Sequence, residues 1–141
     1  MRRTRSRPFS RKEDRVSKLE KAKILLSEAK EDLKHGSYNK AVSASYFAVR
    51  LAAEHFIAIR TSKDDKIANA LYRRMRELVG EERAEEVRLD FLELFSLRKY
   101  ADHRGVLFDR EEAEEIVGLA EGLLLLIVTN LGRETAPTGG G

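Results

Sequence analysis

The sequence predicts an all-α fold, a compact antiparallel bundle of about five helices. Its two prolines, Pro8 and Pro137, lie near the ends of the 141 residues, so no proline ring interrupts the helices between them. No stretch shows the sustained apolar–polar alternation of a half-buried strand. The segments between the expected helices are short, which favours antiparallel neighbours.

The first two helices are expected over residues 11–34 and 38–60. Ser10 and Glu13 have the spacing of a capping box, which satisfies free backbone N–H groups at a helix start. Gly36 marks the end of the first helix, because glycine enters the left-handed region without penalty. The second segment is rich in alanine and aromatic residues on more than one face, so we expect a central helix packed on several sides.

The remaining helices are expected over residues 64–79, 82–103 and 109–132. Ser62 is the expected cap of the third helix. The four residues Asp109-Arg110-Glu111-Glu112 again have the form of a capping box and predict the start of the fifth. Each of these three helices is followed closely by a glycine, which is a common stop signal.

Positive charge is concentrated at the N-terminal end. The chain carries a net charge of +3, but residues 1–23 hold ten Lys and Arg against three Asp and Glu, so the remainder sums to −4. We expect residues 1–12 to be a basic flexible arm that either contacts nucleic acid or remains a solvated tail. Residues 13–132 are expected to form one helical domain, and residues 133–141 a disordered tail.

Composition also excludes several classes of function. Without cysteine, the chain has no disulfide, thiol nucleophile or cysteine-ligated metal, which fits a cytoplasmic protein. No apolar segment follows the basic N-terminus as in a secretory signal, and the apolar run 123–128 is too short to span a membrane. Glycine-rich phosphate loops, serine nucleophile elbows and metal-ligand spacings are missing, so neither a metal nor a cofactor is expected.

An arginine and a histidine stand five positions apart, at Arg98 and His103. A guanidinium can hold a phosphate, and an imidazole can transfer a proton near neutral pH. Helical residues five apart differ by about 140°, so a second copy of the helix across a two-fold axis would be needed to complete a site. The alternative is structural: Arg98 forms an i,i+4 ion pair with Asp102, and the helix macrodipole favours His103 at a C-terminus.

Four further side chains are candidates for substrate binding. Lys99 and Asp102 lie within the Arg98–His103 segment. Tyr46 and Ser45 belong to the aromatic-rich second helix. One interpretation is that Tyr46 packs and hydrogen-bonds in the core, and the other is that its hydroxyl, or that of Ser45, lines a cleft beside Arg98.

Two segments of the chain have a recognisable pattern: the run GSYNKAVSASYFAVR at 36–50, and the Arg-x4-His spacing with Ala-Asp before the histidine. Together they resemble the HEPN domain family, small helical bundles named for nucleotide binding in higher eukaryotes and prokaryotes. The resemblance covers most of residues 15–131. It implies a dimeric, metal-independent endoribonuclease, often the toxin of a toxin–antitoxin pair, whose Arg98 and His103 meet those of a second subunit in a cleft. There Arg98 would hold the scissile phosphate, and His103 would be the general acid or base.

The sequence also departs from the family pattern. Many active members have a small polar residue where this chain has Lys99, and some have a modifiable tyrosine where it has Gly105. The resemblance implies RNA, a second copy and a small nucleotidyltransferase antitoxin as partners. One alternative is a non-catalytic module that binds a nucleotide or a partner nucleotidyltransferase. Another is a purely structural helical protein that dimerises through an apolar face.

Overall fold

Five helices make up the residues that the computed structural model describes, which are 17–58, 63–103 and 105–133. No strand is present in these ranges, so the prediction of an all-α bundle is confirmed. In chain order the helices are α1 (Lys18–Lys34), α2 (Tyr38–Ile57), α3 (Asp64–Val79), α4 (Glu81–Asp102) and α5 (Arg110–Leu131).

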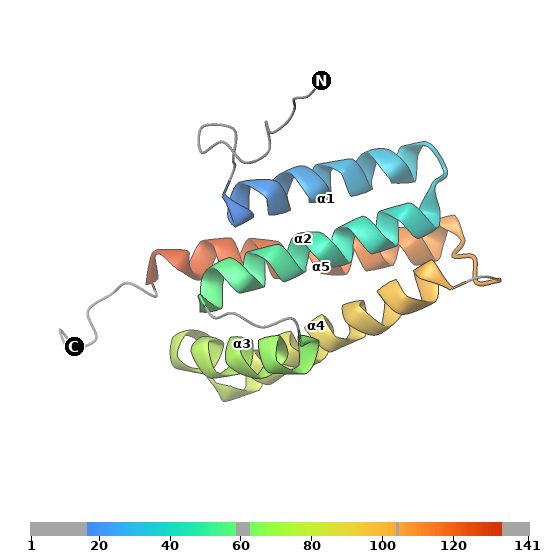
Figure 1. Ribbon diagram of the computed structural model, residues 1–141. Coiled ribbons are helices and arrows are strands. Elements are labelled where there is room, and N and C mark those ends of the chain that lie inside the picture. Colours follow the sequence, from blue (N-terminus) through green and yellow to red (C-terminus); the bar gives the residue numbers. More distant parts are fainter. Residues whose placement is uncertain (1–16, 59–62, 104, 134–141) are drawn as a thin grey trace, which may run out of the picture.

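Helix α2 lies at the centre of the bundle. It contacts all four other helices, and Figure 1 shows α1 on one side of it and α3 and α4 on the other. Its small side chains let these neighbours approach closely. This confirms the prediction of a central helix packed on several sides. Residues of α2 with no exposed surface include Ala41, Val42, Tyr46, Ala48, Val49, Ala52 and Ala53.

Helix α1 begins at Lys18 rather than at residue 11. Ser17 is in the extended conformation, and its hydroxyl accepts from the backbone N–H of Glu20 at 3.0 Å. The Glu20 carboxylate accepts in return from the N–H of Ser17 at 3.2 Å, which completes a capping box. The predicted box of Ser10 and Glu13 lies outside the described residues. Both pairs have the same spacing, so the pattern alone could not choose between them.

The end of α2 differs from prediction, whereas α3 runs over Asp64–Val79 as predicted. Helix α2 ends at Ile57 because Ala58 takes the left-handed conformation, with φ of 56°, and the helical hydrogen-bond series stops there. The predicted end at residue 60 and the predicted cap Ser62 lie outside the described residues. The residue at the cap position of α3 is Lys63, whose side chain makes no capping hydrogen bond.

Helix α4 ends one residue before the prediction, at Asp102. Phe91 and Leu94 have no exposed surface, and burying a side chain of that size contributes about 1.5–3 kcal/mol of stability. Gly105, with φ of 84°, then turns the chain toward α5 in a conformation that is strained for other residues. The packing of α4 thus fixes the segment that carries Arg98.

The start of α5 confirms the predicted capping box. The Asp109 carboxylate accepts from the N–H of Glu112 at 2.8 Å, and the Glu112 carboxylate accepts from the N–H of Asp109 at 3.0 Å. Over the described ranges, no helix combines the length and the apolar character that crossing a membrane would require.

Candidate active site

The guanidinium of Arg98 lies against three aromatic rings. Its Cζ atom is 5.2 Å from the ring centres of Tyr46 and Phe47 on α2, and 6.0 Å from that of Phe95 on α4. The negative faces of aromatic rings attract a cation. We call Tyr46, Phe47 and Phe95 the aromatic cradle. Helices α2 and α4 together therefore determine where the guanidinium lies.

The nitrogen atoms of Arg98 differ in their surroundings. Nη1 donates to Oδ2 of Asp102 at 3.2 Å, and the two side chains are 25% and 50% exposed. Nε is buried and, among the described residues, has no hydrogen-bond partner. The ion pair expected from the i,i+4 spacing is thus present. Such exposed helix pairs contribute only about 0.3–0.5 kcal/mol, so Asp102 holds the guanidinium weakly.

His103 caps the C-terminal end of α4. Its backbone is extended (φ −83°, ψ 141°), its N–H donates to the carbonyl of Tyr100 at 3.1 Å, and its side chain is exposed. The hydrogen bond of the Arg98 side chain goes to Asp102 and not to this imidazole. One chain therefore presents both groups at the same end of α4 without joining them by a hydrogen bond.

Two of the candidate substrate-binding residues lie in contrasting positions. Lys99 is exposed, and its Nζ atom lies 4.6 Å from the ring centre of Phe95. Ser45 has no exposed surface, and its hydroxyl donates to the carbonyl of Val42 at 2.9 Å. The structure therefore gives no support to a Ser45 hydroxyl that lines a cleft.

Tyr46 packs and hydrogen-bonds in the core, and its hydroxyl does not line a cleft beside Arg98. Its ring lies beside Arg98, while its hydroxyl points into the bundle and donates to Oδ2 of Asp64 at the start of α3. Nη1 of Arg50 donates to the Tyr46 hydroxyl and to Oδ1 of Asp64, both at 3.2 Å. Burial, followed by the hydrogen bond to Asp64, raises the pKa of Tyr46 to about 12. The phenol therefore keeps its proton at pH values at which an ordinary tyrosine loses it.

Sequence reasoning missed Asp64 and Asn39. An acidic residue in the first turn of a helix is ordinary dipole compensation, so nothing marked Asp64 as buried. Asn39 lies in the first turn of α2, and its Nδ2 donates to the carbonyls of Ala101 and Val106, each at 2.8 Å. Its Oδ1 accepts from the N–H of Phe108 at 3.0 Å. Asn39 thus fastens the turn that contains His103 to α2.

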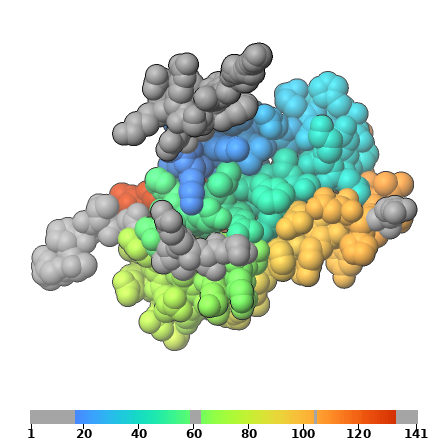
Figure 2. All heavy atoms as spheres, viewed as in Figure 1, coloured from blue at the N-terminus to red at the C-terminus, as the bar shows by residue number. Residues whose placement is uncertain are grey.

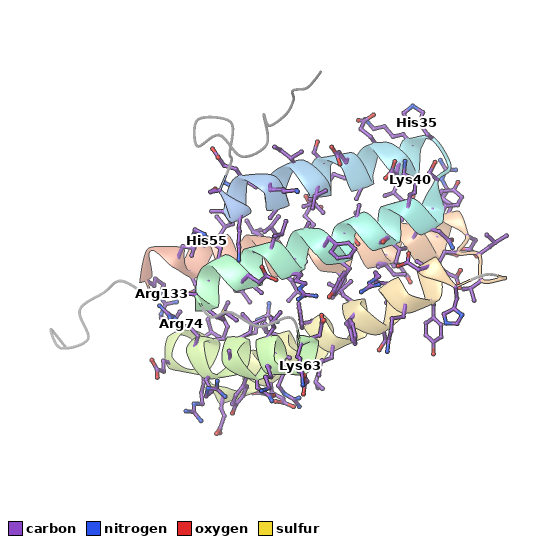
Figure 3. All side chains as sticks on the ribbon, viewed as in Figure 1. His35, Lys40, His55, Lys63, Arg74 and Arg133 are labelled. Atoms are coloured by element: carbon purple, nitrogen blue, oxygen red, sulfur yellow. The ribbon has the colours of Figure 1, made fainter. Side chains whose placement is uncertain are left out.

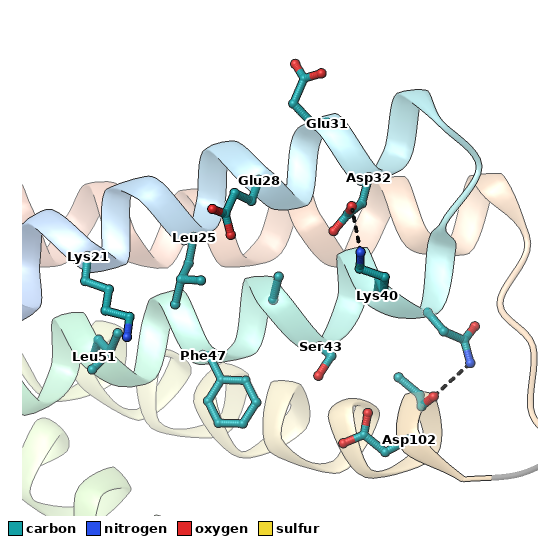
Figure 4. Close-up of a pocket in the computed structure, with 13 residues that line it drawn as sticks. Lys21, Leu25, Glu28, Glu31, Asp32, Lys40, Ser43, Phe47, Leu51 and Asp102 are labelled. Carbon is teal, nitrogen blue, oxygen red and sulfur yellow. Dashed lines mark hydrogen bonds and ion pairs between the residues drawn. The ribbon is translucent and has the colours of Figure 1, made fainter. Parts of the chain in front are cut away.

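An open groove of about 850 Å³ runs between α1, α2 and α4. Figure 2 shows part of α2 at the surface between α1 and α4. Phe47 of the cradle and Leu25 and Leu51 give the groove apolar walls. Asp102, the ion-pair partner of Arg98, lies at its α4 end (Figure 4). The remaining charged side chains that line it are of both signs: Lys21, Glu28, Glu31, Asp32 and Lys40.

The other histidines are remote from this arrangement or bonded elsewhere. His55 lies at the end of the bundle away from the α1–α2 turn, where His35 lies (Figure 3). Nδ1 of His35 is 2.8 Å from the carbonyl oxygen of Glu31 in the preceding turn. Within the described ranges, no group of three or more His, Asp and Glu side chains is placed to hold a metal ion.

The comparisons with known proteins give a family assignment. The family described as "HEPN domain" matches residues 17–131, which includes all five helices and every residue of the candidate site. No match was found among curated proteins or among solved structures. HEPN domains act in RNA cleavage or in other nucleotide-related functions. Since the match covers most of its length, this chain belongs to the HEPN domain family.

Proposed function

We propose that the protein is a metal-independent endoribonuclease that uses Arg98 and His103 of two subunits. The observation that carries the proposal is the aromatic cradle, which fixes one arginine at the end of α4, five residues before an exposed histidine. An arginine with a merely solvated role needs no such enclosure. A guanidinium held in place before substrate arrives is suited to stabilise charge that develops on a phosphate.

The chemistry follows from the two side chains. His103 accepts the proton of a ribose 2′-hydroxyl, whose oxygen attacks the phosphorus, and the partner's His103 donates a proton to the departing 5′-oxygen. Arg98 holds the phosphate oxygens throughout. The products are a 2′,3′-cyclic phosphate and a 5′-hydroxyl. Asp102 gives up its weak pairing with Arg98 when the phosphate arrives, because guanidinium–phosphate bonds are stronger than an exposed helix ion pair.

A second copy of the chain is the occupant that best fits the groove between α1, α2 and α4. The groove borders the Arg98–Asp102 pair, so a copy seated there brings two candidate sites together. Its apolar walls offer area to bury. Its lining charges are of both signs, as with Lys21 and Glu28, and a two-fold interface needs a surface that complements itself.

The biological setting in this proposal is a toxin–antitoxin pair with a small nucleotidyltransferase as antitoxin. HEPN membership supports that setting. Residues 1–12, which are rich in arginine, would raise the encounter rate with RNA through their charge. Growth arrest on expression, relieved by His103→Ala, is the expected outcome in cells.

The test in vitro is cleavage of a single-stranded RNA in EDTA by the wild type, His103→Ala and Arg98→Ala. His55→Ala, which changes a histidine at the other end of the bundle, is the matched control. We expect cyclic-phosphate ends from the wild type and from the control, and a loss of about 10²–10⁴-fold without the imidazole. Undiminished cleavage by His103→Ala would contradict the proposal. If folded wild type does not cleave but binds a nucleotide that Arg98→Ala does not, the protein is a binding module instead.

A further inference from the structure

Of the three rings of the aromatic cradle, that of Tyr46 is the one with no exposed surface. Tyr46 has no exposed surface at all, whereas Phe47, the other α2 ring of the cradle, is 38% exposed. The two rings meet edge to face, with centroids 4.9 Å apart. Tyr46 also packs against Phe95 at 6.0 Å and Phe91 at 6.3 Å. The ring beside Arg98 is therefore enclosed on several sides.

The hydroxyl of Tyr46 is held by two hydrogen bonds. It donates to Asp64, whose side chain is 5% exposed, and accepts from Arg50. Nε of Arg50 donates in turn to Glu54 at 2.9 Å, and Glu54 pairs with Lys18 at 3.0 Å. This series of bonds connects the ring to α3 and to the first turn of α1. A bonded phenol cannot tilt away from Arg98 without breaking a buried hydrogen bond.

The buried Nε of Arg98 has no hydrogen-bond partner among the described residues, so contacts other than hydrogen bonds must hold the buried side of the guanidinium. A buried N–H without a partner costs free energy, so the contacts that keep it there must offset that cost. Cation–π contact with the cradle is the attraction available on the buried side. Asp102 engages only Nη1 and is half exposed.

We propose that Tyr46 is a positioning residue, whose ring sets the orientation of the Arg98 guanidinium while Asp64 and Arg50 hold the ring. Tyr46 does not touch RNA in this proposal, because it is buried. The inference rests on the proposed function only for its effect on catalysis. The effect on Arg98 itself is a property of the folded chain and can be measured without RNA.

The direct measurement is the ¹H–¹⁵N resonance of the Arg98 Nε–H, assigned by its loss in Arg98→Lys. In the wild type we expect ring currents to shift this proton upfield and burial to slow its exchange with water. Tyr46→Leu should move the resonance downfield and speed the exchange. Tyr46→Phe should keep the upfield shift but exchange several-fold faster, because the ring remains and its tie to Asp64 is lost.

Cleavage kinetics give the second readout. We expect Tyr46→Leu to lower kcat by about tenfold with little change in KM, since orientation matters in the transition state and not for RNA capture. Tyr46→Phe should recover most of that loss. Tyr72→Leu is the matched control, because it removes a comparable contact, that of Arg76 with Tyr72 at 5.6 Å on α3.

Two outcomes would overturn the proposal. One is a folded Tyr46→Leu protein whose Arg98 shift and exchange match the wild type. If Tyr46→Leu does not fold, Tyr46→Phe decides: an unchanged exchange rate would show that the anchored hydroxyl does not hold Arg98. If the Arg98 resonance responds as expected but the wild type does not cleave RNA, the positioning role stands and the proposed ribonuclease function fails.

Discussion

Helix α4 contains three arginines, and one of them makes contacts of a different kind from the other two. Arg83 and Arg88 bond to glutamates three residues away, at 2.8 Å and 2.6 Å. Arg98 instead lies against rings from two helices, and among the described residues it forms one ion pair, with the half-exposed Asp102. Flexible surface pairs do little to restrict a long side chain, whereas enclosure by rings does. This contrast marks Arg98 as the arginine with a fixed position.

The raised pKa of Tyr46 predicts a specific loss of stability in alkali. Below the ordinary tyrosine pKa of 10.0, folded and unfolded chains both keep the proton. Between about pH 10 and pH 12 the unfolded chain releases it while the folded chain retains it, so the free energy of unfolding falls. Tyr46→Phe has no proton to release at this position. We therefore expect the stability advantage of the wild type over Tyr46→Phe to shrink by on the order of 2 kcal/mol across this interval.

Urea denaturation of both proteins at a series of pH values measures this difference. Comparing the two proteins cancels the titration of the other groups that they share. An advantage that stays constant through the interval would mean that burial and Asp64 do not hold the phenol in its neutral form.

At the scale of elements, the end of α4 depends on the start of α2. Among the described residues of the turn from α4 to α5, the N–H of Val106 donates to the carbonyl of His103 in a long bond of 3.4 Å. Asn39 supplies three shorter bonds across this turn. Its amide takes the place of a backbone partner that an irregular segment otherwise lacks. The position of His103 is therefore set by a residue more than sixty positions earlier.

Asn39→Ala should loosen this turn and lower the free energy of unfolding by about 2 kcal/mol, since part-buried carbonyls and one N–H lose their partner. Hydrogen exchange should become faster at the Phe108 amide, which donates to Asn39. Asn69→Ala, at an exposed position of α3, is the matched control and should not destabilise the fold. An unchanged exchange rate of the Phe108 amide in Asn39→Ala would contradict the inference that Asn39 holds the turn against α2.

At the scale of the whole molecule, the groove is the surface on which the proposed dimer depends. Ser43 lines it from α2, between the cradle and the first turn of that helix. Because an isologous interface repeats each contact, one unfavourable side chain acts twice. Disruption of this face should therefore separate the subunits and abolish cleavage together.

Ser43→Arg should shift the protein from dimer to monomer in sedimentation experiments and reduce RNA cleavage in parallel. Thr129→Arg introduces the same side chain at an exposed position of α5, which does not line the groove, and should change neither property. Dimers that persist in folded Ser43→Arg would place the interface elsewhere.

The helices could be predicted because their signals are local. Apolar spacing, glycine stops and the capping box of Asp109 and Glu112 act over three or four residues, and the sequence displays them directly. The same locality explains the error at α1, where two capping boxes compete. Only the fold shows that Ala22, about one turn after Lys18, is the first residue of α1 buried in the core.

The sequence by itself determined the all-α class, the central position of α2 and the pairing of Arg98 with Asp102, because helical periodicity fixes which residues are neighbours along one helix. Only the tertiary structure decided what surrounds them. The contact of Tyr46 with Arg98, its anchor on Asp64 and the Asn39 tie join residues 52, 18 and more than sixty positions apart. Such contacts depend on the angles and faces at which helices pack, and the local spacing of residues in the sequence does not determine those angles and faces.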